Sequence, residues 1–211
     1  MKKGILSLAY CLLLALPAVS LAATGWYGSA NVGVAMMSDS DLDITLSGFP
    51  PLTAELSYDT GYTIGGAVGY MMEKFRVEGE LSYQANDIDS LSALGQSESL
   101  NGDMSALTFL FNGYLDFATG GPLTPYITAG IGYSSVDIEI EGGSEDDNLF
   151  TYQLGVGIGY AMSETMTLDL RYRYLGAEDF ETSENVPGLG SGTLKAGVAS
   201  HNITAGLRFA F

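Results

Sequence analysis

The 211-residue chain combines few charged residues, 16% of the total, with 28 Gly, 13 Tyr and 9 Phe. Its 8 basic and 25 acidic side chains give a formal net charge of -17 at pH 7. So acidic a chain repels phosphate backbones, and no nucleic-acid partner is expected. Beyond the N-terminus no apolar run reaches the roughly 18 residues that a spanning helix needs, which excludes an α-helical membrane protein.

The N-terminal segment has the pattern of a secretory signal peptide. Lys2 and Lys3 precede a short apolar run from Ile5 to Leu16, and Ser20–Ala22 forms a small-x-small cleavage site. The sequence therefore predicts two parts, a signal peptide at residues 1–22 and an exported β-barrel domain at residues 23–211. The single cysteine, Cys11, lies in the leader, so no disulfide is expected.

After the leader, apolar residues alternate with small or polar ones. From Trp26 to Met36 the even positions are mostly apolar, whereas the odd positions include Ser29 and Asn31. Successive residues of a β-strand point to opposite faces, so this alternation predicts a strand with one apolar and one polar face. The eight predicted strands are Trp26–Met36, Gly61–Met71, Phe75–Gln84, Ser105–Phe117, Pro125–Ser134, Phe150–Ala161, Met166–Tyr174 and Ser200–Phe211.

The charged residues of these strands all share the small and polar face. A soluble sandwich would turn that face to water, whereas a membrane barrel would turn it to the lumen. The eight residues of this predicted barrel-interior charge cluster are Arg76, Glu78, Glu80, Asp116, Asp169, Arg171, Arg173 and Arg208. Strand lengths near the 9 to 11 residues of a tilted spanning strand, and the even strand number, favour the membrane barrel. The predicted fold is all-β, an eight-stranded antiparallel transmembrane up-and-down barrel.

Aromatic residues and connection lengths support a barrel in a bilayer. Aromatic side chains gather at both margins of the apolar face, as they do at membrane interfaces. Short connections, such as residues 72–74 and 162–165, alternate with long ones at 38–59, 85–103, 136–148 and 176–195. Because bacterial barrels have short periplasmic turns and long outer loops, both termini are predicted to be periplasmic.

Several segments carry a family resemblance. Gly25–Gly28, Phe111–Phe117, Arg171–Tyr174 and the ending Leu207–Phe211 resemble small OmpA-like or opacity-type outer-membrane barrels of the porin family. The resemblance implies location in the cell outer membrane of a Gram-negative bacterium, contact with membrane lipid and lipopolysaccharide, and a monomer. It also implies that Leu207, Phe209 and Phe211 form a C-terminal signal for the outer-membrane assembly machinery. Members of the family serve in adhesion, envelope maintenance and weak pores, so the resemblance indicates architecture rather than activity.

Two interpretations of the predicted lumen remain. An eight-stranded barrel is just wide enough for side chains, so balanced charges would pair and seal it. The alternative is a small-solute or ion pore, since inward glycines, such as Gly155, Gly157 and Gly159, would leave space beside the charges.

The long connections carry most of the acidic residues. The acidic loop between the fifth and sixth strands contains Asp137, Glu139, Glu141, Glu145, Asp146 and Asp147. Such a rim attracts cationic partners, and its hairpin is expected to protrude and to pair with an external strand of a protein partner. The predicted function is that of a surface or envelope protein, adhesive or envelope-stabilising, in which the acids serve binding or only solubility.

Catalysis, metal binding and cofactor binding have weaker support. His201 is the one histidine and has no partner spacing typical of a barrel deacylase, which makes a lipid-modifying enzyme the third hypothesis. Asp39, Asp41 and Asp43 start a calcium-loop spacing, but Ile44 replaces its turning glycine. No enzyme activity, cofactor or metal is therefore predicted.

Overall fold

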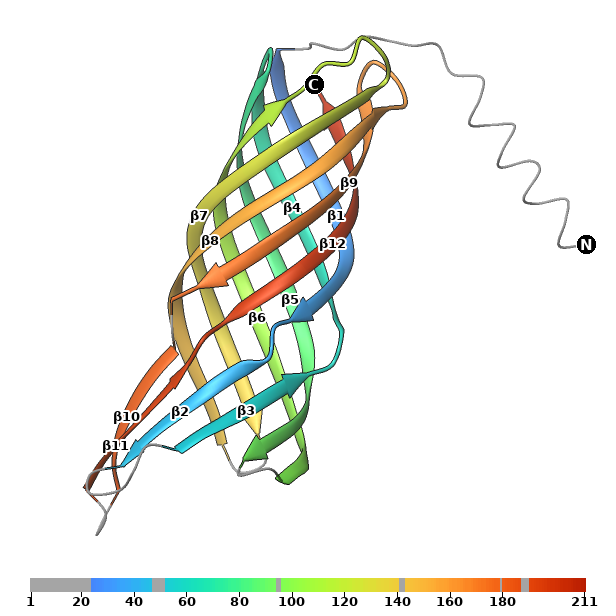
Figure 1. Cartoon of the computed structure of the whole chain (residues 1–211). Coiled ribbons are helices and arrows are strands. Elements are labelled where there is room, and N and C mark those ends of the chain that lie inside the picture. Colours follow the sequence, from blue (N-terminus) through green and yellow to red (C-terminus); the bar gives the residue numbers. More distant parts are fainter. Residues whose placement is uncertain (1–23, 47–51, 94–95, 141–142, 179, 187–189) are drawn as a thin grey trace, which may run out of the picture.

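In the computed structural model the chain forms a closed antiparallel β-barrel (Figure 1). The structure describes residues 24–46, 52–93, 96–140, 143–178, 180–186 and 190–211, so the predicted signal peptide lies outside the described residues. The strands of the wall are β1 (Gly25–Met37), β4 (Gly61–Met72), β5 (Phe75–Ala93), β6 (Gln96–Asp116), β7 (Leu123–Ile140), β8 (Gly143–Ala161), β9 (Met166–Ala177) and β12 (Ala199–Ala210). The predicted eight-stranded barrel is confirmed. None of the described residues belongs to a helix that is long and apolar enough to cross a membrane.

The first and last strands close the cylinder. β1 pairs with β12 on one side, with Tyr27 opposite Ala210, and with β4 on the other. The remaining neighbours follow in chain order, and β5 completes the ring by pairing with both β4 and β6. Closure gives the backbone donors and acceptors of the wall a partner, which is the condition for a sheet in hydrocarbon. The start of β1 and the C-terminus lie at the same end, here called the turn end (Figure 1).

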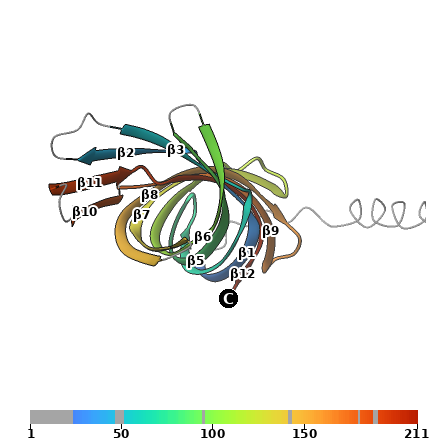
Figure 2. The same ribbon diagram turned by 90° about the horizontal axis from the view of Figure 1, so that it is seen from below.

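The opposite end, here called the hairpin end, corrects the prediction of long loops. Four short strands lie within those connections: β2 (Ser40–Leu46), β3 (Leu52–Tyr58), β10 (Phe180–Val186) and β11 (Gly190–Ala196). They form an extension of the sheet that leans to one side of the barrel mouth (Figure 2). β5 to β8 also run well beyond their predicted ends. A strand leaving the membrane keeps its ladder because its backbone groups still need partners, whatever its side-chain pattern. Two predicted strands extended one residue too far: β6 ends at Asp116 and β12 ends at Ala210.

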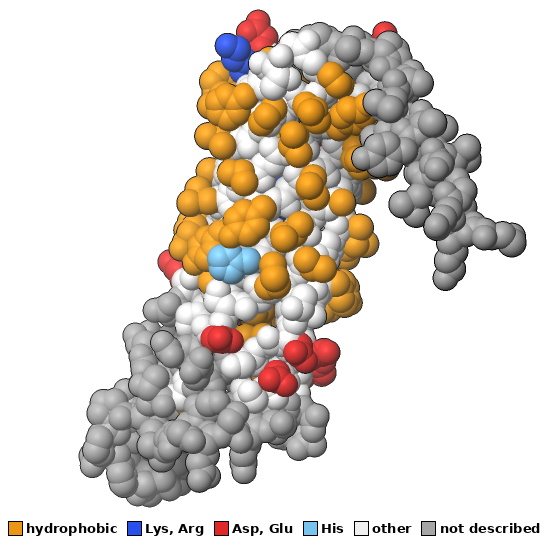
Figure 3. Space-filling view, turned by 45° about the vertical axis from the view of Figure 1, so that its right-hand side comes forward, with side chains coloured by type: hydrophobic (Ala, Val, Ile, Leu, Met, Phe, Trp, Pro, Cys, Tyr) orange, Lys and Arg blue, Asp and Glu red, His pale blue; other side chains and the backbone are white. Residues whose placement is uncertain are grey.

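The molecule is polar inside and apolar outside. Phe75 and Phe109 on the outer face are 59% and 57% exposed, whereas Glu80 and Arg173 in the lumen are 0% and 1% exposed. Figure 3 shows the resulting belt of hydrophobic side chains across one face of the barrel, with acidic side chains at its margins. This arrangement is the reverse of that in a water-soluble protein, and it is the one expected of a barrel surrounded by hydrocarbon.

Aromatic pairs mark both margins of the belt. At the turn end the Trp26 and Tyr70 rings meet edge to face, with centroids 5.4 Å apart. At the hairpin end Tyr133 meets Phe150 in the same way, with centroids 5.8 Å apart. Each pair joins neighbouring strands, so it contributes cross-strand stability as well as an interfacial anchor.

Candidate functional site

All eight predicted interior charges face the lumen. Seven are buried, and Asp169 is half-buried near the turn end. They come from β5, β6, β9 and β12, whose alternation turns every second side chain inward. The structure joins them into three linked groups.

The first group is centred on Arg76. Its Nε and Nη2 donate to the two carboxylate oxygens of Asp116 at 2.8 and 2.9 Å, a bidentate pair. The guanidinium also lies 4.1 Å from the ring centroid of Tyr114 and 4.8 Å from that of Tyr126. Ion pairing and cation–π contact with residues of two strands, β6 and β7, therefore hold the Arg76 side chain.

The second group is centred on Glu80, which is fully buried. Arg173 Nη1 donates to its Oε1 at 2.6 Å, and Arg171 Nη1 donates to its Oε2 at 3.1 Å. Asn112 Nδ2 donates to Oε2 at 3.0 Å, and Gln153 Nε2 in turn donates to Asn112 Oδ1 at 3.0 Å. One carboxylate thus holds two arginines from the opposite wall of the barrel.

The third group lies toward the turn end. Glu78 accepts hydrogen bonds from the hydroxyls of Tyr27 and Tyr114, at 2.9 and 2.7 Å. Tyr126 donates to Asp169, whose other oxygen lies 3.9 Å from Arg208 Nη2. The carboxylates here are held largely by phenols rather than by arginines.

Sequence reasoning missed these lumen tyrosines and amides. The alternation already placed Tyr27, Tyr114 and Tyr126 on the polar face, but the charge pattern drew attention to the ionisable acids and bases alone. Two inward glycines also have a role that was not foreseen: a Cβ at Gly69 would collide with the Tyr27 ring, and one at Gly157 with the Tyr126 ring. These glycines make room for tyrosines instead of leaving voids.

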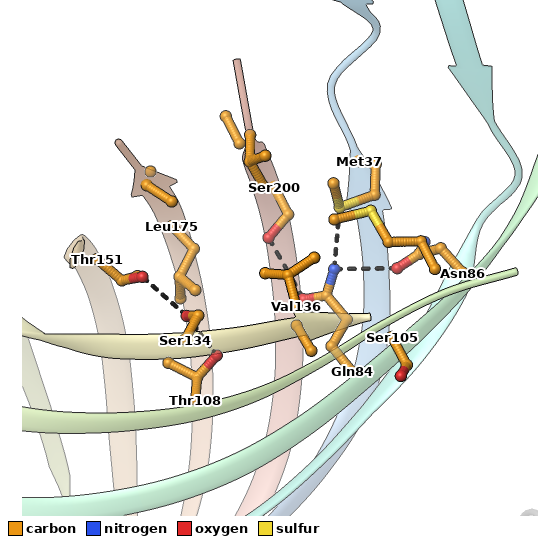
Figure 4. A pocket seen from close by; sticks show the side chains of 16 residues that line it. Met37, Gln84, Asn86, Ser105, Thr108, Ser134, Val136, Thr151, Leu175 and Ser200 are labelled. Atoms are coloured by element: carbon orange, nitrogen blue, oxygen red, sulfur yellow. Dashed lines mark hydrogen bonds between the residues drawn. The ribbon is translucent and has the colours of Figure 1, made fainter. Parts of the chain in front are cut away.

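Toward the hairpin end the lumen becomes uncharged. Gln84 is the centre of this region: its Nε2 donates to Asn86 Oδ1 at 2.9 Å and to Met37 Sδ at 3.2 Å (Figure 4). Its Oε1 accepts from Asn202 and Ser200 at 3.1 and 3.3 Å. A cavity of about 30 Å³ lies among these side chains.

An apolar cluster covers the lumen at its hairpin end. Met104, Val136 and Leu149 are buried there and pack against partly buried neighbours that include Ile138 and Val198. Alternation along β7 turns Val136 and Ile138 inward into this cluster, while Asp137 points out to water. Nothing in the sequence analysis predicted that the cluster would cover the mouth.

At the turn end a cavity of about 110 Å³ lies at the barrel mouth and includes Lys74, Glu164 and Arg208 in its wall. A second cavity of about 30 Å³ lies deeper, among Arg76, Glu78 and Arg171. Arg208 lines both cavities and therefore lies between them.

Exposed carboxylates stand in register above the belt. Asp87 pairs with Asp103, and Asp103 pairs with Glu139, across β5, β6 and β7. Asp137, also on β7, lies opposite Asp146 on β8. Like charges placed directly opposite one another destabilise a sheet, so this row is held by the ladder rather than by its side chains. Of the predicted acidic loop, Asp137, Glu139, Asp146 and Asp147 are described on strands, whereas the side chains of Glu141 and Glu145 lie outside the described residues.

The other candidates lie apart from the lumen. His201 faces outward, where its Nδ1 is 2.7 Å from the Tyr172 hydroxyl. The side chains of Asp41 and Asp43 lie outside the described residues, and no group of His, Cys, Asp or Glu within the described part could hold a metal ion. Leu207, Phe209 and Phe211 all point outward at the turn end.

A closed cylinder with an apolar exterior and an ion-paired lumen defines the class of outer-membrane β-barrels. The family model for the outer membrane protein beta-barrel domain matches residues 6–211. The chain belongs to this family and is located in the cell outer membrane.

Relatives and solved structures agree with this assignment. Outer membrane protein PagN of Salmonella typhimurium is 32% identical over 88 residues, which are 37% of either chain. Major surface antigen 4 of Anaplasma marginale is 27% identical over 175 residues, 69% of this chain and 60% of that protein. The chain thus spans less than two thirds of the length of these relatives.

Two solved structures share the fold at 18% identity. OprG from Pseudomonas aeruginosa has a TM-score of 0.67, and Neisserial surface protein A has one of 0.55. In each case the match covers 89% of this chain and 97% of the other chain.

Proposed function

We propose that this chain is a non-enzymatic surface protein in which a sealed barrel displays acidic hairpins to a cationic external protein partner. The observation that carries the proposal is the cross-strand row of exposed carboxylates, which includes Asp103, Glu139 and Asp137. Such a row retains its electrostatic penalty unless a positive partner offsets it, and the sheet holds it in a fixed geometry. Membership of a family with a named surface antigen relative is consistent with this role.

A free strand edge supports the same proposal. β9 pairs with β8 only from Thr151 onward, and Phe150 accepts one further bond from Glu178. Among the described residues no strand pairs with the outer edge of β8 between Gly143 and Leu149. An extended segment of a partner can add to such an edge, and Asp146 beside it favours a basic one.

The test removes three of the five charges of the row without changing its shape. We expect the triple substitution D137N/E139Q/D146N to weaken strongly the binding of a fluorescent oligolysine peptide to cells that display the protein, and to reduce cell–cell adhesion. Raising the salt concentration should weaken wild-type binding in the same assay, because exposed charges are screened within about 8 to 10 Å.

E164Q, at the turn end, is the matched control and should bind like the wild type. The proposal fails if the triple variant, present at the surface in normal amounts, binds and adheres as the wild type does.

A pore is the second candidate function. Its support is the pair of cavities at the turn end, which meet at Arg208. For the sealed barrel we expect no steady single-channel current in planar bilayers. R171A removes one of the two arginines held by Glu80 and would open a conducting path only if this group is the gate. Steady wild-type openings that R171A alters would replace the sealed barrel by a pore.

Four further assignments belong to the same proposal. Residues 1–22 act as a cleaved signal peptide, the turn end faces the periplasm, and the barrel is a monomer. Leu207, Phe209 and Phe211 form the signal for the assembly machinery, since their side chains are displayed on the outer face of the last strand.

A further inference from the structure

The outer face of the barrel contains a long groove inside the apolar belt. Its volume is about 710 Å³, and it crosses β5 to β9. Its floor is one row of register partners, which runs from Val77 through Gly113, Ala129 and Leu154 to Tyr174. Because Gly113 and Ala129 have little or no side chain, the sheet surface is recessed in the middle of the row.

The groove climbs from one membrane face toward the other. Val77 and Gly113 lie near the turn end of their strands, whereas Tyr174 lies near the hairpin end of β9. A parallel row from Phe75 through Leu115, Ile127 and Val156 to Tyr172 forms one side. Four spacings between neighbouring strands give a length of about 19 Å. One leaflet contributes half of the hydrocarbon core, about 15 Å, so the groove is long enough for an extended acyl chain.

Polar aromatic groups stand at the upper end of the groove. The register continues from Tyr174 to His201 on β12. The Tyr172 and His201 rings are stacked, with centroids 6.0 Å apart, and the Tyr172 hydroxyl is 2.7 Å from His201 Nδ1. The Tyr174 ring lies 5.3 Å from the His201 ring. When Tyr172 donates to Nδ1, the imidazole proton is on Nε2, which is then a donor for an external acceptor.

We propose that this groove is a binding site for one phosphorylated lipid of the outer leaflet. Its acyl chain lies over Gly113 and Ala129, and its phosphate accepts a hydrogen bond from Nε2 of His201, where the Tyr172 hydroxyl holds the imidazole proton. The site is continuous with the belt that hydrocarbon already covers, which favours a lipid over a protein as the occupant. The groove retains one chain because Leu115 and Ile127 contact it along one side in addition to the floor, whereas a flat wall would offer the floor alone. The assignment rests on the proposed orientation, with the hairpin end outside.

The experiment uses the full mature barrel, folded in detergent and incubated with lipid A, and counts retained lipid by native mass spectrometry. We expect the double substitution G113L/A129L, which fills the groove, to weaken retention of lipid A at least tenfold. G79L is the matched control: Gly79 also faces outward with no atom near its added Cβ, but it lies outside the groove. Folding of each variant is checked by its faster migration on unheated detergent gels.

The head-group end has its own test. The double substitution Y172F/H201F keeps both rings and removes their donors, so it should weaken lipid A but leave dephosphorylated lipid A unchanged. Equal retention by wild type and G113L/A129L, or an equal loss in G79L, overturns the site. A loss in Y172F/H201F that is the same for both lipids overturns the phosphate contact. The substitution D137N/E139Q/D146N should leave the retention of lipid A unchanged. Failure of the lipid site and failure of the hairpin proposal are therefore separate results.

Discussion

Replacing Glu80 by alanine should lower the free energy of unfolding of the barrel by about 3 to 5 kcal/mol, the cost of leaving buried charges unpaired. Glu80 is fully buried and is the only acid within the described residues that forms ion pairs with Arg171 and Arg173. Without it, the two guanidinium groups from β9 lie side by side in a narrow lumen with no carboxylate between them. The measurement is reversible urea unfolding in lipid vesicles, followed by the shift from the folded to the unfolded band on unheated gels.

Two further variants serve as comparisons for E80A. E80Q keeps the shape of the side chain and part of its hydrogen bonding, so its loss should be smaller than that of E80A. E164A removes an exposed acid at the turn end and should be neutral. If E80A unfolds at the same urea concentration as E164A, the ion pairs do not hold the lumen together.

Placing an arginine on the outer face in the middle of the belt should cost about 2 to 4 kcal/mol, because hydrocarbon cannot solvate the charge. Phe111 is the position for this test: it lies on β6 between Leu107 and Leu115 on the same outer face, and it is 58% exposed. F111R should therefore unfold at a lower urea concentration in vesicles than the wild type does.

F117R is the control at the margin of the belt. Phe117 follows the end of β6 and is also exposed, but the cost of a charge falls to about 0 to 1 kcal/mol near the interface. Equal losses for F111R and F117R would contradict a depth-dependent hydrocarbon environment. A protein packed against the same face would penalise both positions by steric conflict.

The wall of the barrel was predictable because its signal is local. Alternation along β5 assigns Arg76, Glu78 and Glu80 to one face without knowledge of any other strand, and the same holds for Arg171 and Arg173 on β9. Which charges pair was not predictable. Glu80 meets its two arginines across the lumen, at sequence separations of 91 and 93 residues, and the closure of the cylinder alone brings them together.

The structure of the hairpin end was not predictable from local sequence. β10 lacks a regular alternation, and β2 alternates over only 7 residues, too few to predict a spanning strand, yet backbone hydrogen bonding continues the sheet through both. The apolar cluster around Val136 depends on β6, β7 and β8 meeting over the mouth. The outer groove likewise depends on register, since Gly113 and Ala129 become neighbours only when β6 and β7 pair.

Lipid surrounds the apolar face while the charged face is sealed within, and site-directed spin labelling tests this arrangement directly. Single cysteines at Phe111 and Asn112, adjacent on β6 but on opposite faces, are labelled in the barrel folded in vesicles. We expect the label at 111 to collide freely with dissolved oxygen and hardly with a water-soluble nickel chelate. We expect the label at 112 to be shielded from both. A label at 111 that is shielded from oxygen, or readily reached by the nickel chelate, would contradict this arrangement.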